Sequence, residues 1–292
     1  RAEPVDLAGR TVLVTGATPG SLGFATAHAL RAWGAQVVVS TRTRTSVAAA
    51  VLGPDVLAYP LDLADALSVE AFVRWYEQEV GRLDVLVNNA GIHLDLRSRW
   101  KQPRLTADGF ELHWRTNYLG AAHLTHALLP LLLKADAPRV VNVVSKLHAR
   151  GSNDALDAPL DPYDSWGAYG TSKLALVHLT TELARRHPSV GTAALHPGSV
   201  YTRIADRGLE EQRLLSRVRR VLAPLERRAL LTPEQGAQTS LHCATAALPV
   251  SGGYYEQCAV REPSADARDS AAAARLWEQT ASWLATLRPQ AR

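Results

Sequence analysis

Residues 11–40 read TVLVTGATPGSLGFATAHALRAWGAQVVVS, and this stretch decides the fold. The β-branched run Thr11–Thr15 predicts a strand, and residues Gly23–Trp33 predict a helix that Gly34 ends. Gln36–Ser40 is a second β-branched run and predicts a second strand. About thirty residues is the length of a βαβ unit, in which a helix crosses over between two parallel strands.

The same alternation of strand and helix continues along the chain. The predicted strands are continuous apolar runs, which indicates a sheet covered on both faces. We therefore predict an α/β fold, a single Rossmann-type doubly wound parallel sheet with helices on both faces. No repeat or polar linker divides the chain, so we expect one domain, residues 1–292. The patterns further predict a helix near Ser68–Val80, a strand Leu83–Asn88, a long helix near Asp108–Leu133, a strand Arg139–Ser145, a helix near Ala168–Arg186 and a sixth strand Thr192–His196, with irregular stretches at Ser152–Trp166 and Ser199–Thr232.

Composition and charge exclude several classes of protein. Of the 292 residues, 47% are hydrophobic and 21% are charged, which is typical of a folded globular protein. The longest nearly apolar stretch, Leu119–Leu133, is shorter than the roughly 18 to 20 residues that a membrane span needs, and residues 1–10 lack the apolar segment of a secretory signal. The net charge of +4 is small and no aromatic side chains interleave with a basic stripe, so we expect no nucleic-acid partner.

Cysteine usage indicates a reducing compartment. The two cysteines, Cys243 and Cys258, lack the spacing of metal ligands and cannot form a disulfide framework. We expect no metal site and a cytoplasmic location.

The first predicted strand leads into a glycine-rich turn, Thr15-Gly16-Ala17-Thr18-Pro19-Gly20-Ser21-Leu22-Gly23. Glycines let the backbone approach a pyrophosphate closely, and the free N–H groups and dipole of the following helix attract its charge. A turn of this composition can also serve packing alone. Its place after the first strand of a βαβ unit favours dinucleotide binding.

The end of the second predicted strand bears on which dinucleotide binds. NAD-binding folds usually place an acidic residue there for the ribose 2′-hydroxyl, but the sequence has Ser40-Thr41-Arg42. Arg42 and Arg44 could pair with a 2′-phosphate, so NADP(H) is the predicted cofactor. The alternative is that both arginines are solvated loop residues.

Two further motifs carry polar chemistry. Asn88-Asn89-Ala90-Gly91 follows the fourth strand directly, and Tyr169-Gly170-Thr171-Ser172-Lys173 opens a predicted helix. Positions i and i+4 share a helix face, so Tyr169 and Lys173 are expected to project into the same space. A fixed ammonium stabilises a phenolate and is expected to lower the pKa of Tyr169 from about 10, which suits general acid/base catalysis.

In this order and combination, the three motifs resemble the short-chain dehydrogenase/reductase family, and are most similar to its branch of retinol dehydrogenases and WW-domain oxidoreductases. The resemblance covers nearly the whole chain. It includes DGFELHWRTNYLG (108–120), RVVNVVSKLHARG (139–151), SKLALVHLTTELARR (172–186), LHPGSVYT (195–202) and TPEQGAQTSLHCA (232–244).

The resemblance implies a catalytic tetrad. Tyr169 would be the general acid/base, and Lys173 would lower its pKa and hold the nicotinamide ribose. Ser145 would hydrogen-bond the substrate oxygen, and Asn117 would hold a water of the proton relay. Taken singly, Ser145 could simply end a strand, Asn117 could satisfy a kinked helix and Asp62 could cap a turn. The resemblance also implies how the cofactor is bound: Asp62 would meet the adenine, Asn88 and Gly91 would border the cofactor, and Pro197, Gly198 and Thr202 would flank the nicotinamide. The full set of implied cofactor-binding residues is Gly16, Thr18, Gly20, Ser21, Leu22, Gly23, Arg42, Asp62, Leu63, Asn88, Ala90, Gly91, Tyr169, Lys173, Pro197, Gly198, Val200 and Thr202.

The sequence departs from the family pattern at two places. The family's glycine turn is TGxxxGxG, whereas this turn is TGxxxGxxG, one residue longer. Either Ser21 is an extra residue, or Gly20 and Ser21 share the role of one glycine. The second departure is Lys146, which places a positive charge directly after Ser145 where the family usually has an apolar residue.

Residues 199–232 are predicted to form a helical substrate lid. Within them, Leu214, Val218, Val221 and Leu225 recur at helical spacing among arginines, which indicates a basic amphipathic helix. Such a helix could cover a lipophilic substrate or contact an anionic membrane surface or a carrier protein. It could equally be a solvated surface helix.

These features predict an NADP(H)-dependent oxidoreductase that interconverts a carbonyl and an alcohol on a lipophilic small molecule. Two alternatives remain open at this stage: a non-redox lyase or cyclase on the same scaffold, and a nucleotide-sensing binding protein without turnover. We expect a monomer or a homodimer.

Overall fold

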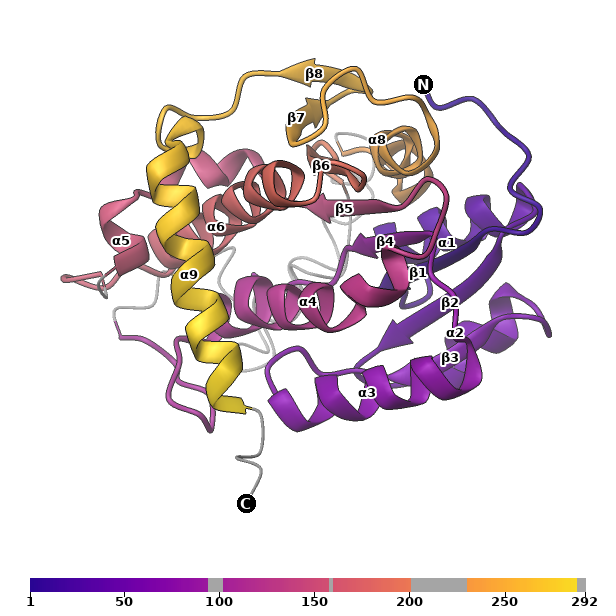
Figure 1. The fold of residues 1–292 in the computed structure, drawn as a ribbon, viewed down its shortest axis with the longest axis horizontal. Coiled ribbons are helices and arrows are strands. Elements are labelled where there is room, and N and C mark those ends of the chain that lie inside the picture. The colour runs from indigo at the N-terminus through magenta and orange to yellow at the C-terminus, as the bar shows by residue number, and fades with distance from the viewer. Residues whose placement is uncertain (94–101, 158–159, 201–229, 288–292) are drawn as a thin grey trace, which may run out of the picture.

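The computed structural model describes residues 1–93, 102–157, 160–200 and 230–287, and these form one eight-stranded sheet with helices on both faces (Figure 1). The strand order is β3-β2-β1-β4-β5-β6-β7-β8. Neighbouring strands pair in parallel from β3 to β7, and β8 pairs with β7 antiparallel. The strands are β1 Thr11–Thr15, β2 Gln36–Thr41, β3 Leu57–Pro60, β4 Val85–Asn88, β5 Arg139–Val143, β6 Gly191–His196, β7 Gly253–Glu256 and β8 Ala259–Arg261.

Two helix layers enclose the sheet. The larger core cluster includes side chains from α3, α4, α6 and α9, and the second cluster includes side chains from α1, α2 and α8. The helices are α1 Leu22–Ala32, α2 Thr45–Leu52, α3 Ala66–Glu79, α4 Gly120–Leu132, α5 Asp154–Asp157, α6 Ser165–Arg186, α8 Pro233–Thr245 and α9 Ser270–Leu287, with a π-helix η1 Trp114–Leu119 and short 3-10 turns η2 Lys146–Arg150 and η4 Asp266–Arg268.

The strand sequences explain why both faces are covered. In β1, Val12 and Val14 lie in the cluster of α1, and Leu13 lies in the cluster of α4. All three side chains are fully buried. Because successive side chains of a strand point to opposite faces, a continuous apolar run requires a helix layer on each side. The predicted α/β doubly wound fold is confirmed, with the antiparallel β8 as an added edge strand.

Helix α9 lies across α6 and α4 in Figure 1. Its Trp277 ring packs 4.5 Å from the His126 ring of α4, and its Thr280 hydroxyl lies 2.6 Å from the Tyr118 hydroxyl of η1. Helix α9 therefore contacts η1, the segment that carries Asn117.

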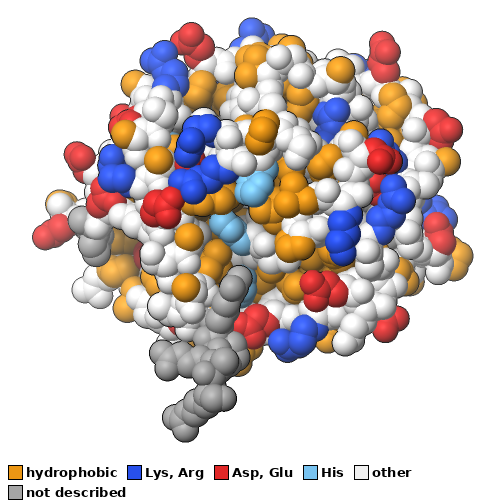
Figure 2. All heavy atoms as spheres, in the orientation of Figure 1, with side chains coloured by type: hydrophobic (Ala, Val, Ile, Leu, Met, Phe, Trp, Pro, Cys, Tyr) orange, Lys and Arg blue, Asp and Glu red, His pale blue; other side chains and the backbone are white. Residues whose placement is uncertain are grey.

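Figure 2 shows charged side chains of both signs spread over this face, with a few histidines near its centre.

The chain order creates a switch point between β1 and β4. From β1 the chain builds outward to β2 and β3, and then returns to β4 on the other side of β1. The loops after these two strands therefore diverge at the carboxyl edge of the sheet, which is where doubly wound folds bind their ligands.

Two predicted helix boundaries were wrong, and the stretch Ser152–Trp166, which was expected to be irregular, contains the short helix α5. The helix expected from Asp108 begins later, because Gly109 has φ +83° and Leu105 and Glu111 form an isolated bridge that closes a turn. The helix expected from Ala168 begins earlier, at Ser165, because the Asp164 side chain accepts the Gly167 N–H at 3.1 Å. The predicted lid helix lies outside the described residues.

Candidate active site

The glycine-rich turn after β1 is shaped by two residues with positive φ. Gly16 has φ +72° and Gly20 has φ +78°, a backbone region that suits glycine. A Cβ at Gly16 would lie 2.8 Å from Ala90 Cα, whereas one at Gly20 would meet nothing within 4 Å. Ser21 caps α1: its hydroxyl accepts the Phe24 N–H at 3.1 Å and donates to Gly16 O at 3.2 Å. Ser21 thus fixes the end of the turn against the start of α1.

Asn89 joins this turn to the loop after β4. Its Nδ2 donates to Thr15 O at 2.8 Å, and Thr15 Oγ1 accepts the N–H groups of Asn89 and Ala90 at 3.1 and 3.0 Å. A Cβ at Gly23 would lie 2.3 Å from Asn89 Nδ2, so α1 approaches this side chain as closely as only glycine permits. Asn89 is not among the predicted site residues, although its place directly after β4 is a sequence signal for this role.

The start of α1 suits an anionic group. The first amides of a helix have no partner within the helix, and the helix dipole is positive there. The first turn of α1 contains no acidic residue, and the glycine turn is open at Gly20. Thr18 lies in the same turn, where its carbonyl accepts the Ser21 N–H at 2.9 Å. This segment, which also contains Leu22, therefore fits the pyrophosphate of a dinucleotide.

The predicted ribose and adenine contacts lie at the ends of β2 and β3. Arg42 directly follows β2 and is exposed, as is Arg44. Asp62 Oδ1 accepts the Ala64 N–H at 3.0 Å and so closes its own turn. Leu63 is buried. Both ends belong to the same carboxyl edge as the glycine turn, because β3, β2 and β1 are parallel neighbours.

Asn88 points into the core rather than toward this edge. Its Nδ2 donates to Thr125 Oγ1 and to Asn142 Oδ1, both at 2.9 Å, and the side chain is buried. The Asn88 side chain thus joins β4, β5 and α4. Only its backbone remains for the predicted border with a cofactor.

The loop after β6 contains the residues expected beside the nicotinamide. Pro197 follows β6, and Gly198 has φ +87°. A Cβ at Gly198 would lie 2.6 Å from Leu231 Cδ1, and Val200 forms an isolated parallel bridge with Leu231. Thr202 lies outside the described residues.

The structure brings Ser145 to Tyr169 through the contact of two helices. Ser145 caps η2, where its hydroxyl accepts the Leu147 N–H at 3.2 Å. A Cβ at Gly170 would lie 2.7 Å from Leu147 O, so η2 packs directly on α6. The Ser145 side chain consequently lies near enough to the Tyr169 hydroxyl to lower the pKa of that phenol.

Lys173 and Asn117 meet at Gly91. A Cβ at Gly91 would lie 3.1 Å from Lys173 Nζ and 3.2 Å from Asn117 Oδ1. Lys173 Nζ donates to Val143 O at 3.0 Å. Asn117 Oδ1 accepts the Ile92 N–H at 2.7 Å, and its Nδ2 donates to Ile92 O at 3.0 Å. The π-helix that carries Asn117 is a rare backbone form found frequently at functional sites.

Burial controls the ionisation of this group. Burial raises the pKa of Tyr169 to about 12, although the hydrogen bond with Ser145 lowers it. Burial lowers the pKa of Lys173 to about 8. The expected lowering of the tyrosine pKa is therefore wrong for this structure, since desolvation of the phenolate outweighs the stabilising contacts.

Histidines that the sequence analysis missed surround Tyr169. The His93 ring stacks on the Tyr169 ring with centroids 4.2 Å apart and planes at 22°, and Trp166 meets His93 edge-on at 5.0 Å. His113 meets the Tyr169 ring edge-on at 6.1 Å, and its Nδ1 lies 2.8 Å from Glu111 Oε1. The only sequence signal was that His93 lies two residues after Gly91 and His113 four residues before Asn117.

Lys146, the second departure from the family pattern, pairs with a carboxylate. Its Nζ lies 2.7 Å from Glu256 Oε1 at the end of β7. The extra positive charge after Ser145 is thus balanced within the protein.

His196, at the end of β6, is buried, and burial lowers its pKa to about 4.

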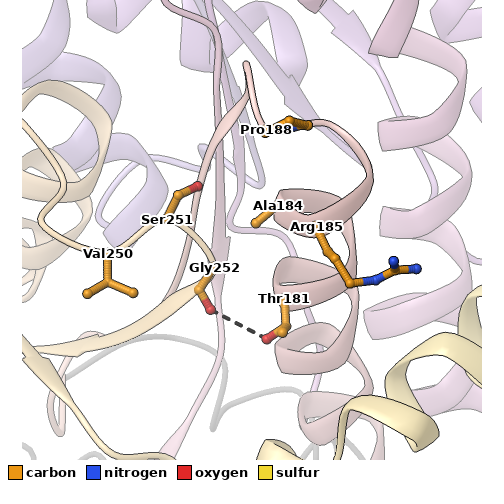
Figure 3. A pocket seen from close by; sticks show the side chains of 7 residues that line it. All are labelled: Thr181, Ala184, Arg185, Pro188, Val250, Ser251 and Gly252. Carbon is orange, nitrogen blue, oxygen red and sulfur yellow. Dashed lines mark hydrogen bonds between the residues drawn. The ribbon is translucent and has the colours of Figure 1, made fainter.

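A shallow hollow of about 440 Å³ lies away from these residues, between the last turns of α6 and the loop before β7 (Figure 3). Arg185 and Val250 line it, and Thr181 Oγ1 donates to Gly252 O at 3.4 Å. The hollow contains none of the predicted site residues. Across the described ranges, we find no cluster of side chains suited to a metal and no helix long and apolar enough to cross a membrane.

Comparisons with known proteins agree with the geometry. The family profile for short chain dehydrogenase matches residues 10–213. The chain is 38% identical to retinol dehydrogenase 12 of Bos taurus, over 94% of this chain and 85% of that protein. It is 39% identical to dehydrogenase/reductase SDR family member 13 of Homo sapiens, over 94% and 72%. A crystal structure of an uncharacterised protein from Mycobacterium paratuberculosis matches with a TM-score of 0.74 at 31% identity, over 97% of this chain and 96% of that chain.

Proposed function

Because this chain belongs to the short-chain dehydrogenase family, as an oxidoreductase that uses a nicotinamide cofactor on an alcohol or carbonyl substrate, we propose that it is an NADP(H)-dependent reductase or dehydrogenase with Tyr169 as its acid/base. The observation that carries the proposal is the convergence of Ser145 on Tyr169 and of Lys173 and Asn117 on Gly91. Four polar side chains, two from α6, one from η1 and one from the N-cap of η2, lie beside a turn that fits a pyrophosphate.

The protein's own residues supply the proton chemistry. Ser145 and Tyr169 would hydrogen-bond the substrate oxygen, and the Tyr169 hydroxyl would donate its proton to the oxygen as the carbonyl becomes an alcohol. The raised pKa of Tyr169 keeps the phenol protonated at neutral pH, which suits a donor. When bound, the nicotinamide cofactor supplies the hydride.

Lys173 and Asn117 would restore the proton to Tyr169. With a pKa near 8, the Lys173 ammonium can lose and regain a proton close to neutral pH. Asn117 lies beside it at Gly91 and keeps an oxygen lone pair after accepting the Ile92 N–H. A water held there would link the lysine to solvent, as the family resemblance implies.

The cofactor preference rests on the end of β2. Arg42 and Arg44 are both exposed at the edge where the ribose would lie, and Ser40-Thr41-Arg42 contains no carboxylate. A guanidinium pairs strongly with a 2′-phosphate, whereas an acidic residue would repel it. NADP(H) is therefore the proposed cofactor.

The substrate class rests on the relatives. Retinol dehydrogenases, which are named for a lipophilic alcohol, are 35% to 38% identical to this chain. We extend this to a lipophilic alcohol or aldehyde as the class of substrate here.

The test is an assay of the full chain with NADPH and a series of aldehydes from short-chain to retinaldehyde. Consumption of NADPH in step with alcohol formation, faster for the lipophilic aldehydes, is the expected result. Loss of aldehyde without oxidation of NADPH would indicate the lyase or cyclase alternative. Cofactor binding without any turnover across the series would indicate a binding protein and contradict the proposal.

A further inference from the structure

Glu111 lies outside the tetrad and accepts three hydrogen bonds. Its Oε1 lies 2.8 Å from His113 Nδ1 and accepts the Tyr163 hydroxyl at 3.0 Å, and its Oε2 accepts the Trp114 N–H at 2.8 Å. A carboxylate only accepts hydrogen bonds, so His113 Nδ1 must carry a hydrogen. The side chain of His113 is fully buried and that of Glu111 is 18% exposed.

Glu111 stays ionised despite this burial. Burial raises the pKa of Glu111, but the hydrogen bond and charge of His113, together with backbone N–H groups, outweigh it and hold the pKa below its usual value. Hydrogen bonds to an ionised acceptor are roughly twice as strong as those between neutral groups. All three contacts are therefore charge-assisted at neutral pH.

The three donors lie at or just before the starts of η1 and α6, the helices that carry Asn117, Tyr169 and Lys173. Trp114 is the first residue of η1, which carries Asn117. Tyr163 directly precedes Asp164, the N-cap of α6, which carries Tyr169 and Lys173. Glu111 thus joins the starts of both helices, which lie 51 residues apart in sequence.

His113, the remaining donor to Glu111, also contacts the Tyr169 ring. The His113 ring meets the Tyr169 ring edge-on, at 6.1 Å between centroids and 82° between planes. The His93 ring stacks on the Tyr169 ring with centroids 4.2 Å apart, and it also lies 6.2 Å from the His113 ring. With its hydrogen fixed on Nδ1, His113 cannot rotate without breaking its bond to Glu111.

We propose that Glu111 is a positioning residue for the reaction, holding η1 and α6 in register and fixing the His113 ring against Tyr169. The role rests on the proposed function, because it concerns the same proton transfer by Tyr169. A small misplacement of an acid/base group lowers the rate of the chemical step more than it lowers binding. Glu111 therefore affects kcat and not the affinity for cofactor.

Glu182, on the helix α6 that carries Tyr169, offers a matched control. Its carboxylate is also buried and accepts charge-assisted hydrogen bonds, from Arg185 at 2.7 and 2.9 Å and from Arg186 at 2.7 Å. These partners lie at the far end of α6 from Tyr169. Glu182→Gln thus removes a comparable charge from α6 without touching the register of η1.

The first experiment compares Glu111→Gln with Glu182→Gln and the wild type. Glutamine keeps the shape of Glu111 but presents an amide to one of the three donors. We expect Glu111→Gln to lower kcat at least tenfold, to leave the dissociation constant for NADPH within twofold, and to raise the primary isotope effect on kcat with deuterated NADPH. Glu182→Gln should keep kcat and the isotope effect within twofold of the wild type.

Two further variants separate positioning from folding. His113→Asn can still donate to Glu111, whereas His113→Phe keeps a ring without a donor, so the asparagine variant should retain several times more activity. If Glu111→Gln does not fold, this pair decides the question. Equal activity of the two His113 variants would overturn the proposal. So would a fall in kcat for Glu111→Gln with an unchanged isotope effect, because that pattern marks fewer folded molecules rather than a slower chemical step.

An NMR measurement keeps the inference independent of turnover. Tyrosine-ring ¹³C labelling with Tyr169→Phe as reference identifies the Tyr169 signal. Glu111→Gln should shift this signal and Glu182→Gln should not. If the wild type turns over no aldehyde, the proposed function fails, and the Tyr169 signal alone decides the positioning role. An unmoved signal in Glu111→Gln would overturn it.

Discussion

The Asn117 side chain donates from Nδ2 to the Ser172 hydroxyl at 3.0 Å, and Ser172 in turn donates to Tyr169 O at 2.7 Å. This chain of two hydrogen bonds joins η1 to α6 at the level of the tetrad. Ser172 lies between Tyr169 and Lys173 in sequence and is fully buried. The serine therefore links the two helices from inside the core, as Glu111 does at their starts.

Ser172→Ala should lower both stability and turnover. The substitution leaves one hydrogen of the Asn117 amide without its partner, and an unsatisfied buried donor costs about 1–3 kcal/mol. We expect a lower melting temperature and a several-fold lower kcat. Ser240→Ala is the control, because Ser240 is also buried and its hydroxyl has no hydrogen-bond partner in the described structure. Equal effects of the two substitutions would show that the link to Asn117 contributes nothing.

Tyr169→Phe should abolish turnover and keep cofactor binding. The ring and its stacking on His93 remain, and only the transferable proton is lost. General acid catalysis typically contributes about 10²- to 10⁴-fold, so kcat should fall by that amount. Lys173→Ala should reduce both turnover and cofactor affinity, since the ammonium is proposed to contact the ribose. Strong activity of the phenylalanine variant would show that another group transfers the proton.

The layered fold and the motif residues could be predicted from sequence, because both depend on local patterns. Strand Thr11–Thr15 matches its prediction at both ends, since a β-branched run ends where the glycine turn begins. The i, i+4 spacing of Tyr169 and Lys173 likewise follows from helix geometry. The direction of the Tyr169 pKa shift does not, because it depends on how many other elements exclude water from the ring.

Residues that act through distant partners were not predictable. Glu111 contacts Tyr163, 52 residues further along the chain, and no spacing rule connects them. Asn88 looked like a cofactor contact because it stands in a motif at a strand end. Its side chain instead points into the core, where it donates hydrogen bonds to Thr125 and Asn142. Successive side chains of a strand point to opposite faces, so a shift of one residue places a side chain in a different environment. Sequence alone does not reveal which partners fill each face.

Arg42→Ala should remove the preference for NADPH over NADH. A charge-assisted pair with a 2′-phosphate contributes roughly 1.5–3 kcal/mol, or about ten- to a hundredfold in affinity. Titration of both cofactors with wild type and variant measures it. The affinity for NADH should not change, which serves as the internal control. A wild-type protein that binds both cofactors equally would contradict the prediction.

Gly23→Ala should weaken cofactor binding by displacing α1. The new methyl group would lie 2.3 Å from Asn89 Nδ2 and 2.9 Å from Gly16 O, so the helix start must move away from the turn. Overpacking of this kind costs typically 1–3 kcal/mol. We expect at least a tenfold higher dissociation constant for the dinucleotide. In Gly191→Ala, where a Cβ meets no atom closer than 3.6 Å, affinity should stay unchanged.

His178 provides a test of how burial couples stability to pH. His178 belongs to α6 and its side chain is fully buried, with its Nε2 2.9 Å from Asn153 Oδ1. Its Nδ1 is buried without a hydrogen-bond partner in the described structure. Burial lowers the pKa of His178 to about 4, with Asp269 and Asp266 raising it and Arg275 lowering it further. The folded protein therefore resists protonation of this ring.

A group whose pKa is lower in the folded state binds more protons when unfolded, so stability falls as the pH drops from about 6.5 toward 4. At pH 5 this one ring should cost about 2 kcal/mol relative to pH 7. His178→Gln can still donate to Asn153 but does not titrate, so its melting temperature should fall less between pH 7 and pH 5 than that of the wild type. Thermal unfolding of both proteins at the two pH values measures the difference. Parallel losses in wild type and variant would mean that protonation of His178 does not contribute to acid destabilisation.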